Sequence, residues 1–331
     1  MTSSTPDKVA VVTGASSGIG AATARALAAD GYRVALLARR LDRITTLADE
    51  LGNGSIAIEA DVTDRDSIVA AADRVRQEPG TADALINNAG VMLLGPFDSD
   101  QREDYRQMIE VNLLGAITTT EVFLDQLKDG GGDIINISSV AGRTARSGNG
   151  VYAATKWGIN GWSESLRQEL LPDVRVTLVE PGVVATELPN HITHADTKQG
   201  VRQLYDKAEV TAEDVAEIIA FILSRPRRLA INEILLRPAG QRDAPQLVDR
   251  PSDEQSLQLQ AGRLTSLNIF EFAAGGGTVH PSACPACGQP ADDADPIPAA
   301  LRSSLEHLRG QLENLAEARL SQRGALVTRD S

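Results

Sequence analysis

Short apolar runs alternate with longer amphipathic segments along the first 240 residues of this 331-residue chain. Seven runs hold Val, Ile, Leu and Ala at consecutive positions: KVAVVTG, RVALLARR, SIAIEADV, ALINNAG, DIINISS, VRVTLVEPG and NEILLRP. Unbroken apolar runs of this length are typical of strands that are buried on both faces of a parallel sheet. The pattern therefore predicts seven strands of one parallel sheet.

The segments between these runs carry apolar residues at helical spacing. They predict helices over residues 21–30, 42–51, 67–76, 103–128 and 152–171. Strands and helices in alternation require right-handed crossovers, which place helices on both faces of the sheet. We therefore predict an α/β fold built on a doubly wound parallel sheet.

The alternation stops near Gly240, where we predict a domain boundary. Residues 241–331 hold 7 of the 15 prolines, no lysine, the run Gly275–Gly277 and both cysteines. Helices are predicted over 254–263 and 298–320, and the rest of this segment is predicted to be loop or linker. The chain is thus expected to hold one α/β domain, residues 1–240, and a C-terminal extension of mostly loop with one or two helices.

The composition is that of a globular protein, with 42% hydrophobic and 23% charged residues. A net charge of −13 argues against a nucleic-acid surface, which needs clustered Lys and Arg. The sequence has neither a signal-peptide pattern at its start nor an apolar run long enough for a membrane span. The first 240 residues contain no cysteine, as suits a reducing compartment. We expect a cytoplasmic protein that binds neither nucleic acid nor membrane.

Three glycines follow the first predicted strand in the run TGASSGIG, directly before a predicted helix. Glycine lets the backbone turn sharply and approach a ligand, and a helix N-terminus offers unpaired N–H groups to an anion. This order favours a pyrophosphate site, although a plain tight turn is the alternative. The residues expected to contact the ligand are Gly14, Ser16, Ser17, Gly18, Ile19 and Gly20.

The end of the second predicted strand indicates which dinucleotide is bound. NAD sites usually place an acidic residue there for the ribose 2′-hydroxyl, whereas a 2′-phosphate needs a cation. This sequence has the neutral Ala38, followed by Arg39 and Arg40, which can form bidentate contacts to phosphate. The pattern favours NADP. The alternative is that the two arginines only solvate the start of the next helix.

Ser139, Tyr152 and Lys156 form the candidate reaction centre. Tyr152 and Lys156 are four residues apart, so they lie on one face of the predicted helix. An ammonium group beside a phenol lowers the pKa of the phenol and brings it towards the range useful for acid/base chemistry. Taken alone, such a pair is also what an exposed helix surface carries.

Six motifs in this order resemble the short-chain dehydrogenase/reductase family: TGASSGIG, NNAG (87–90), EVNLLGA around Asn112, ISS (137–139), YAATK (152–156) and PG (181–182). The resemblance covers about residues 6–240 and implies a Rossmann fold. LLARRLDRI and ELPNHITHADTK are most similar to the NADP-dependent branch that contains clavulanic acid dehydrogenase and 3-hydroxy acid dehydrogenases. The family further implies a homodimer or homotetramer that is built on helices 103–128 and 152–171.

The resemblance assigns a role to each catalytic candidate. It implies that Tyr152 exchanges a proton with the substrate oxygen and that Ser139 hydrogen-bonds the same oxygen. Lys156 is expected to hold the nicotinamide ribose and to lower the pKa of Tyr152, while Asn112 anchors a water that passes protons to solvent. The family also implies further cofactor contacts: Asp61, Val62, Asn88, Ala89, Gly90, Pro181, Gly182, Val184 and Thr186.

These features predict an NADP(H)-dependent oxidoreductase (EC 1.1.1.-) that interconverts a small aldehyde or ketone and its alcohol, in the reducing direction. The alternative from another class is an NADP-binding regulator or scaffold that acts through the C-terminal extension. The intact set of catalytic candidates argues against this alternative.

The segment from Pro181 to about Lys207 is expected to determine the substrate, because it leaves the carboxyl end of a strand and can close over the site. Several basic side chains on it and after Ser139 suggest a polar or carboxylate-bearing carbonyl substrate, or else are solvated surface charges. They are Arg143, Arg146, His191, His194, Lys198, Arg202 and Lys207. The spacing of the two histidines, without acids or cysteines nearby, does not favour a metal site.

The extension contains one Cys-x-x-Cys pair, Cys284 and Cys287, with His280 just before it. The pair resembles half of a zinc ribbon, but a closed zinc site needs four ligands. We therefore predict no bound metal, and an unbound or redox-active pair is the favoured interpretation. Leucines at alternating spacings of four and three, from Leu301 to Leu315, predict an apolar helix stripe for docking or pairing.

Overall fold

The computed structural model describes residues 8–240, and within them the predicted parallel sheet is confirmed. All seven predicted strands lie in this sheet, in the order β3-β2-β1-β4-β5-β6-β9. Their bounds are β1 (Val9–Thr13), β2 (Arg33–Ala38), β3 (Ile56–Glu59), β4 (Ala82–Asn87), β5 (Asp133–Ile137), β6 (Arg175–Pro181) and β9 (Glu233–Leu236). Every neighbouring pair in the sheet is parallel.

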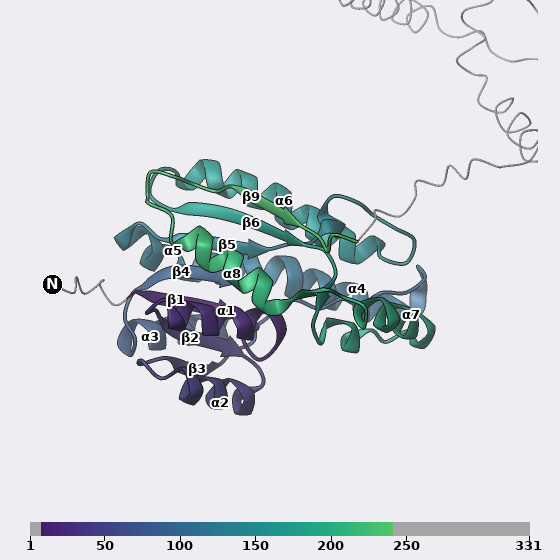
Figure 1. Cartoon of the computed structure of the whole chain (residues 1–331), viewed down its shortest axis with the longest axis horizontal. Coiled ribbons are helices and arrows are strands. Elements are labelled where there is room, and N and C mark those ends of the chain that lie inside the picture. The colour runs from purple at the N-terminus through teal and green to yellow at the C-terminus, as the bar shows by residue number, and fades with distance from the viewer. Residues whose placement is uncertain (1–7, 241–331) are drawn as a thin grey trace, which may run out of the picture. The chain divides into compact units, whose positions relative to one another are not determined.

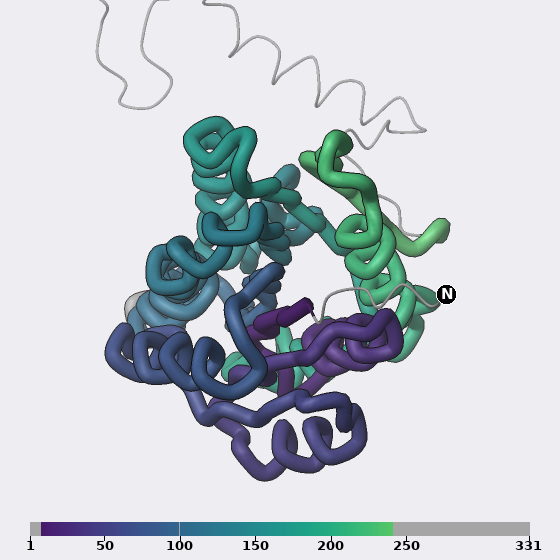
Figure 2. Tube along the Cα trace, turned by 90° about the vertical axis from the view of Figure 1, so that its left-hand side faces the viewer, coloured from purple at the N-terminus to yellow at the C-terminus, as the bar shows by residue number. Residues whose placement is uncertain are grey.

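Helices cover both faces of the sheet, as the alternation predicts (Figures 1 and 2). One face carries α1 (Gly18–Ala29), α2 (Leu41–Leu51) and α8 (Ala212–Leu223). The other carries α3 (Arg65–Gln77), α5 (Gly115–Gly130) and α6 (Gly150–Leu170). The remaining helices, α4 (Arg102–Ile109) and α7 (Ala195–Tyr205), lie beyond one end of the sheet (Figure 1).

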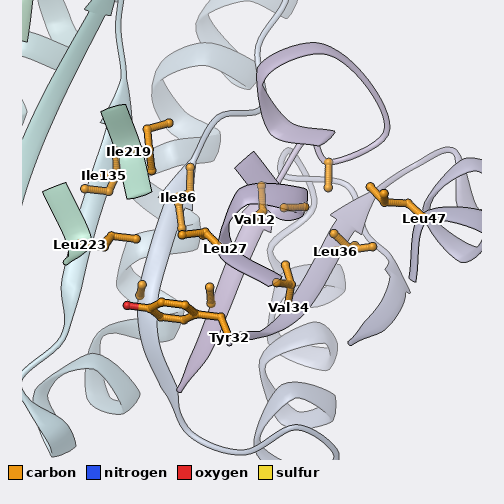
Figure 3. Close-up of a cluster of buried hydrophobic side chains, with 14 of the residues drawn as sticks. Val12, Leu27, Tyr32, Val34, Leu36, Leu47, Ile86, Ile135, Ile219 and Leu223 are labelled. Carbon is orange, nitrogen blue, oxygen red and sulfur yellow. The ribbon is translucent and has the colours of Figure 1, made fainter. Parts of the chain in front are cut away.

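The strands are apolar at consecutive positions because each one contributes side chains to the hydrophobic cores on both faces of the sheet. Successive side chains of a strand point to opposite faces. Val12 packs with Leu27 of α1 and Ile219 of α8 on one face (Figure 3), and its neighbour Val11 packs with Phe123 of α5 on the other. The sheet is therefore buried on both sides, as expected for parallel strands.

The strand order reverses between β1 and β4, because β2 and β3 lie on one side of β1 and the later strands lie on the other. A crevice opens at such a switch point, at the carboxyl ends of the strands. The chain leaves β1 at Thr13 and β4 at Asn87, so the glycine turn and the NNAG motif meet at this crevice. The fold therefore brings together two motifs that are about 70 residues apart.

The predicted helix over 103–128 is wrong as a single helix. The structure divides it into α4, a π-helical turn (Glu110–Leu114) and α5. The apolar period continues through this turn, so the pattern alone did not reveal it. A Cβ at Gly115 would lie 2.8 Å from Cγ2 of Val62, so glycine is needed where the turn packs closely on the loop after β3.

Three further elements were not predicted: α7, α8 and a short parallel pair of β7 (Val184–Ala185) with β8 (Val210–Thr211). Helix α1 also begins three residues earlier than predicted, inside the glycine motif. Among residues 8–240, no helix has both the length and the apolarity that a membrane span requires.

The predicted C-terminal extension, residues 241–331, lies outside the described residues. The same holds for its candidate helices, for His280, Cys284 and Cys287, and for the leucine stripe from Leu301 to Leu315. The boundary at residue 240 therefore stays a prediction.

Candidate active site

A cavity of about 770 Å³ lies at the carboxyl ends of the strands and is lined by residues that follow six of them. Nearly all predicted site residues line it: Gly14, Ser16, Ser17, Gly18, Ile19, Arg39, Arg40, Asp61, Val62, Asn88, Ala89, Gly90, Ser139, Tyr152, Lys156, Pro181, Gly182, Val184 and Thr186. Gly20 and Asn112 are the exceptions, and both support the cavity wall from behind. The volume is in the range typical of cofactor and ligand pockets.

The glycine turn is shaped by its packing on the end of β4. Gly14 has φ +65°, and a Cβ there would lie 2.8 Å from Cα of Ala89. A Cβ at Gly20 would lie 2.5 Å from Nδ2 of Asn88, which donates hydrogen bonds to the carbonyls of Thr13 (2.9 Å) and Gly14 (3.3 Å). These two glycines are therefore required by contacts within the protein.

The same turn leaves the start of α1 open to the cavity. Ser17, the N-cap residue, is extended, and its side chain accepts no hydrogen bond from the first turn of the helix. Ser17, Gly18 and Ile19 all line the cavity. The N–H groups at this helix start and the positive end of its dipole suit an anion such as pyrophosphate.

Thr13 is a structural residue of this site that the sequence interpretation missed. Its buried hydroxyl accepts hydrogen bonds from the N–H groups of Asn88 and Ala89, both at 3.0 Å, and donates one to the carbonyl of Ile86. It thereby fixes the exit of β4 against the glycine turn. A polar residue at the end of an otherwise apolar strand was the available signal.

Arg39 and Arg40 form a cationic end of the cavity. Arg40 donates hydrogen bonds to the hydroxyls of Ser16 (2.8 and 3.0 Å) and Ser17 (2.8 Å). Arg39 is largely exposed, and its guanidinium lies 4.0 Å from the carboxylate of Asp61. Guanidinium groups and hydroxyls at this position are suitable donors for a 2′-phosphate, and the buried Ala38 places no acid there.

Arg40 also reaches across the cavity to Glu187, at 3.2 Å, and Arg43 contacts the same carboxylate at 3.1 Å. The two arginines, chiefly through the hydrogen bond from Arg40, lower the pKa of Glu187. Glu187 follows Thr186 on the segment that was predicted to determine the substrate. The contact therefore joins that segment to the cationic end of the cavity.

Tyr152, Lys156 and Ser139 meet in the cavity, as predicted. Nζ of Lys156 lies 5.8 Å from the ring centre of Tyr152 and donates a hydrogen bond to the carbonyl of Ile137 at 2.9 Å. Ser139 caps a short 3-10 turn (Val140–Gly142), where its hydroxyl accepts from the N–H of Ala141 at 3.1 Å. The three side chains come from α6 and from the loop after β5.

Burial controls the protonation of this centre. It raises the pKa of Tyr152 to about 12, with the Ser139 hydrogen bond acting in the opposite direction. It lowers the pKa of Lys156 to about 8. Desolvation is the largest influence on the pKa of this phenol. The expectation that Lys156 lowers the same pKa stays a prediction. The phenol is protonated at neutral pH and can act as an acid.

Asn112 lies in the π-helical turn and is buried. Its Oδ1 accepts from the N–H of Val91 and its Nδ2 donates to the carbonyl of Val91, both at 2.8 Å. Nδ2 also lies 3.3 Å from the hydroxyl of Thr155 on α6. The side chain thus joins the loop after β4 to α6 behind the cavity, instead of pointing into it.

Arg143 is not at the cavity rim, contrary to expectation. It forms an ion pair with the buried carboxylate of Glu180 at 2.8 Å and also contacts Glu233. Asn160 of α6 donates to Glu180 at 2.6 Å and accepts from the hydroxyl of Ser138 at 2.6 Å. This network connects α6, β6 and the loop that holds Ser139, and sequence patterns gave no signal for it.

The substrate end of the cavity is walled by a 3-10 turn (Leu188–His191) and by α7. Of the five basic residues predicted on this segment, His191 alone lines the cavity, and burial together with nearby cations lowers its pKa. His194 instead caps α7, and Arg202 donates to Asn190 at 2.8 Å. Arg146 lines the cavity from the opposite loop.

Comparison with known proteins identifies the fold and its chemistry. A family model described as short chain dehydrogenase matches residues 8–197. An uncharacterised oxidoreductase of Staphylococcus saprophyticus is 37% identical over 240 residues, which are 71% of this chain and 97% of the relative.

Among solved structures, the chain is similar to two dehydrogenases in complex with a dinucleotide. An alcohol dehydrogenase from the archaeon Thermococcus sibiricus, complexed with 5-hydroxy-NADP, has 34% identity and a TM-score of 0.64 over 71% of this chain and 98% of its own. The closed form of a serine dehydrogenase, complexed with NADP⁺, has 33% identity and a TM-score of 0.69 over 73% of this chain and 100% of its own.

Proposed function

The chain belongs to the short-chain dehydrogenase/reductase family of oxidoreductases, and we propose that it uses NADPH to reduce a small aldehyde or ketone to its alcohol. The proposal rests on one observation: Tyr152, Ser139 and Lys156 line the same cavity as a glycine turn and two arginines. The cavity thus contains both an acid/base group and groups that are suited to bind a phosphorylated dinucleotide. The narrower likeness to the branch with clavulanic acid dehydrogenase is also a proposal.

The residues of the cavity fit NADP(H). Arg39, Arg40 and Ser16 would hold the 2′-phosphate, and the N–H groups at the start of α1 would hold the pyrophosphate. The two similar structures described above are complexed with NADP⁺ and with an NADP derivative. When bound, NADPH supplies the hydride for the carbonyl carbon, and NADP⁺ accepts one in the reverse reaction.

The side chains of α6 and of the loop after β5 would transfer the proton to and from the substrate oxygen. Tyr152 donates the proton of its hydroxyl to the substrate oxygen as that oxygen gains charge, and Ser139 hydrogen-bonds the same atom. The resulting phenolate is stabilised by the ammonium of Lys156 until a proton returns from solvent. The reducing direction needs a phenol that is protonated at the start, and burial, which raises the pKa of Tyr152, is compatible with this form.

The cavity supports a small substrate with an apolar body. Leu94, Val201 and Leu204 contribute apolar side chains at the substrate end. Arg146 lines the opposite wall and, among the described residues, its guanidinium is paired with no carboxylate. It is the best candidate in this wall to bind a carboxylate of the substrate.

A screen of aldehydes and ketones for NADPH oxidation, compared between the unmodified protein and Tyr152→Phe, tests the proposal. We expect turnover of some compounds by the unmodified protein, and a loss of at least about 100-fold in the variant. NADPH affinity should be retained in the variant. Fluorescence titration measures this affinity, because it reports binding without chemistry. Unchanged turnover in Tyr152→Phe would contradict the role of Tyr152. No turnover of any carbonyl would contradict the proposed reaction and favour the regulator alternative.

A further inference from the structure

Helix α7 presents one face to the substrate end of the cavity. Thr197, Val201, Leu204 and Tyr205 line it, and their spacing places them along one side of the helix. Two of these are apolar, and the hydroxyl of Thr197 is engaged with Nδ1 of His194 at 2.9 Å. Tyr205 therefore supplies the remaining polar group of this face.

The hydroxyl of Tyr205 has little of its hydrogen-bonding capacity in use. Within the described residues, its one hydrogen-bond partner is Sδ of Met92, at 3.9 Å. A thioether sulfur is a weak acceptor, whereas buried phenols usually bond to oxygen or nitrogen. Met92 lines the same cavity, so the donor stands beside the space that a substrate would enter.

Tyr205 also lies close to the reaction centre. It packs on the apolar cluster that contains Met92, Ala141 and Tyr152. Burial, together with the charge of an ionised Tyr152, raises the pKa of Tyr205 above its usual range. The hydroxyl therefore stays protonated in the working pH range and is available as a donor.

We propose that Tyr205 is a specificity residue: its hydroxyl donates a hydrogen bond to an oxygen on the carbon next to the reactive carbonyl, which selects α-hydroxy carbonyl compounds. This inference rests on the proposed function, since Tyr152 and Ser139 hold the carbonyl oxygen there. The apolar surroundings make the contact selective. A substrate without the oxygen leaves this partly buried donor with only the weak sulfur acceptor of Met92, and such a loss lowers affinity.

Two pairs of substrates of equal size test this inference. Hydroxyacetone differs from 2-butanone, and glycolaldehyde from propanal, by a hydroxyl in place of a methyl group. For Tyr205→Phe we expect kcat/KM to fall about 10-fold for the two hydroxy compounds and to stay within about twofold for the two others. Tyr32→Phe is the matched control, because this phenol is buried in the core away from the cavity.

Binding is measured separately in the Tyr152→Phe background, where the chemistry is blocked. Titration of the NADPH complex with hydroxyacetone should show an approximately 10-fold higher Kd when Tyr205→Phe is added, and 2-butanone should show no change. Equal effects on both compounds, no effect on either, or no binding of either would overturn the inference. Failure of all four carbonyls to be reduced by the unmodified protein, with the binding difference intact, would instead contradict only the proposed reaction.

Discussion

The guanidinium of Arg40 lies 2.8 Å from the hydroxyl of Ser17. The side chain of Arg40, just after β2, is therefore hydrogen-bonded to the side of the glycine turn. The contact places the positive charge of Arg40 beside the start of α1. The guanidinium and the N–H groups of the helix start both favour an anion, and here they lie together.

The double variant Arg39→Ala/Arg40→Ala should raise the Kd of NADPH by about 10- to 100-fold and leave that of NADH within about threefold. The reason is that the two dinucleotides differ by the 2′-phosphate alone. Fluorescence titration measures both constants. Arg43→Ala is the control, since Arg43 contacts Glu187 but does not line the cavity. Equal losses for both dinucleotides would overturn the assignment of NADP.

Lys156→Met should stabilise the fold at pH 7 by about 2 kcal/mol. Burial lowers the pKa of Lys156 from 10.5 to about 8, so the unfolded chain binds this proton more tightly than the folded one. Below pH 8 the folded protein bears the full free-energy cost of burying the charged ammonium of Lys156. Between about pH 8 and 10.5 this cost disappears. The advantage of the variant should therefore vanish as the pH rises through this window.

Urea unfolding at pH 7 and pH 10 measures this advantage, with the exposed Lys128→Met as control. A difference between variant and unmodified protein that does not change with pH would show that buried charge is not its source. Turnover should be lost in Lys156→Met at both pH values, which would separate the gain in stability from catalysis.

Glu180→Gln should lower the free energy of unfolding by about 3 kcal/mol and lower kcat. The substitution leaves Arg143 without its buried partner and disturbs the network that fixes the Ser139 loop. Glu50→Gln is the matched control, because Glu50 pairs with Arg25 on the surface and its loss should change the free energy of unfolding far less. Similar losses in both variants would contradict a special role for the buried carboxylate.

The predicted homo-oligomer can be tested on three exposed apolar side chains. Ile109, Leu114 and Trp157 are about half exposed and come from α4, the π-helical turn and α6, which contact one another. We expect Leu114→Glu/Trp157→Glu to convert a dimer or tetramer into a smaller species in light scattering. Leu41→Glu, on α2, should not alter the assembly. An unmodified protein that is monomeric would contradict the prediction.

The sequence predicted the sheet well because a strand buried on both faces is apolar at consecutive positions, as residues 9–12 and 34–38 are. It also located the residues that line the cavity, because the family motifs lie at strand ends. It misplaced Arg143, since a basic residue after Ser139 looks the same whether it faces a ligand or pairs with Glu180. It missed Tyr205 for a similar reason: α7 has no motif, and the contact with Met92 spans 113 residues.

The packing of Gly14 and Gly20 on Asn88 and Ala89 has a consequence for how such proteins are recognised in genomes. Both glycines would be retained by selection for folding even in a descendant that had lost its dinucleotide. A survey that infers dinucleotide use from the glycines alone would therefore count inactive paralogues as enzymes, whereas Tyr152 and the two arginines are free to diverge once catalysis is lost.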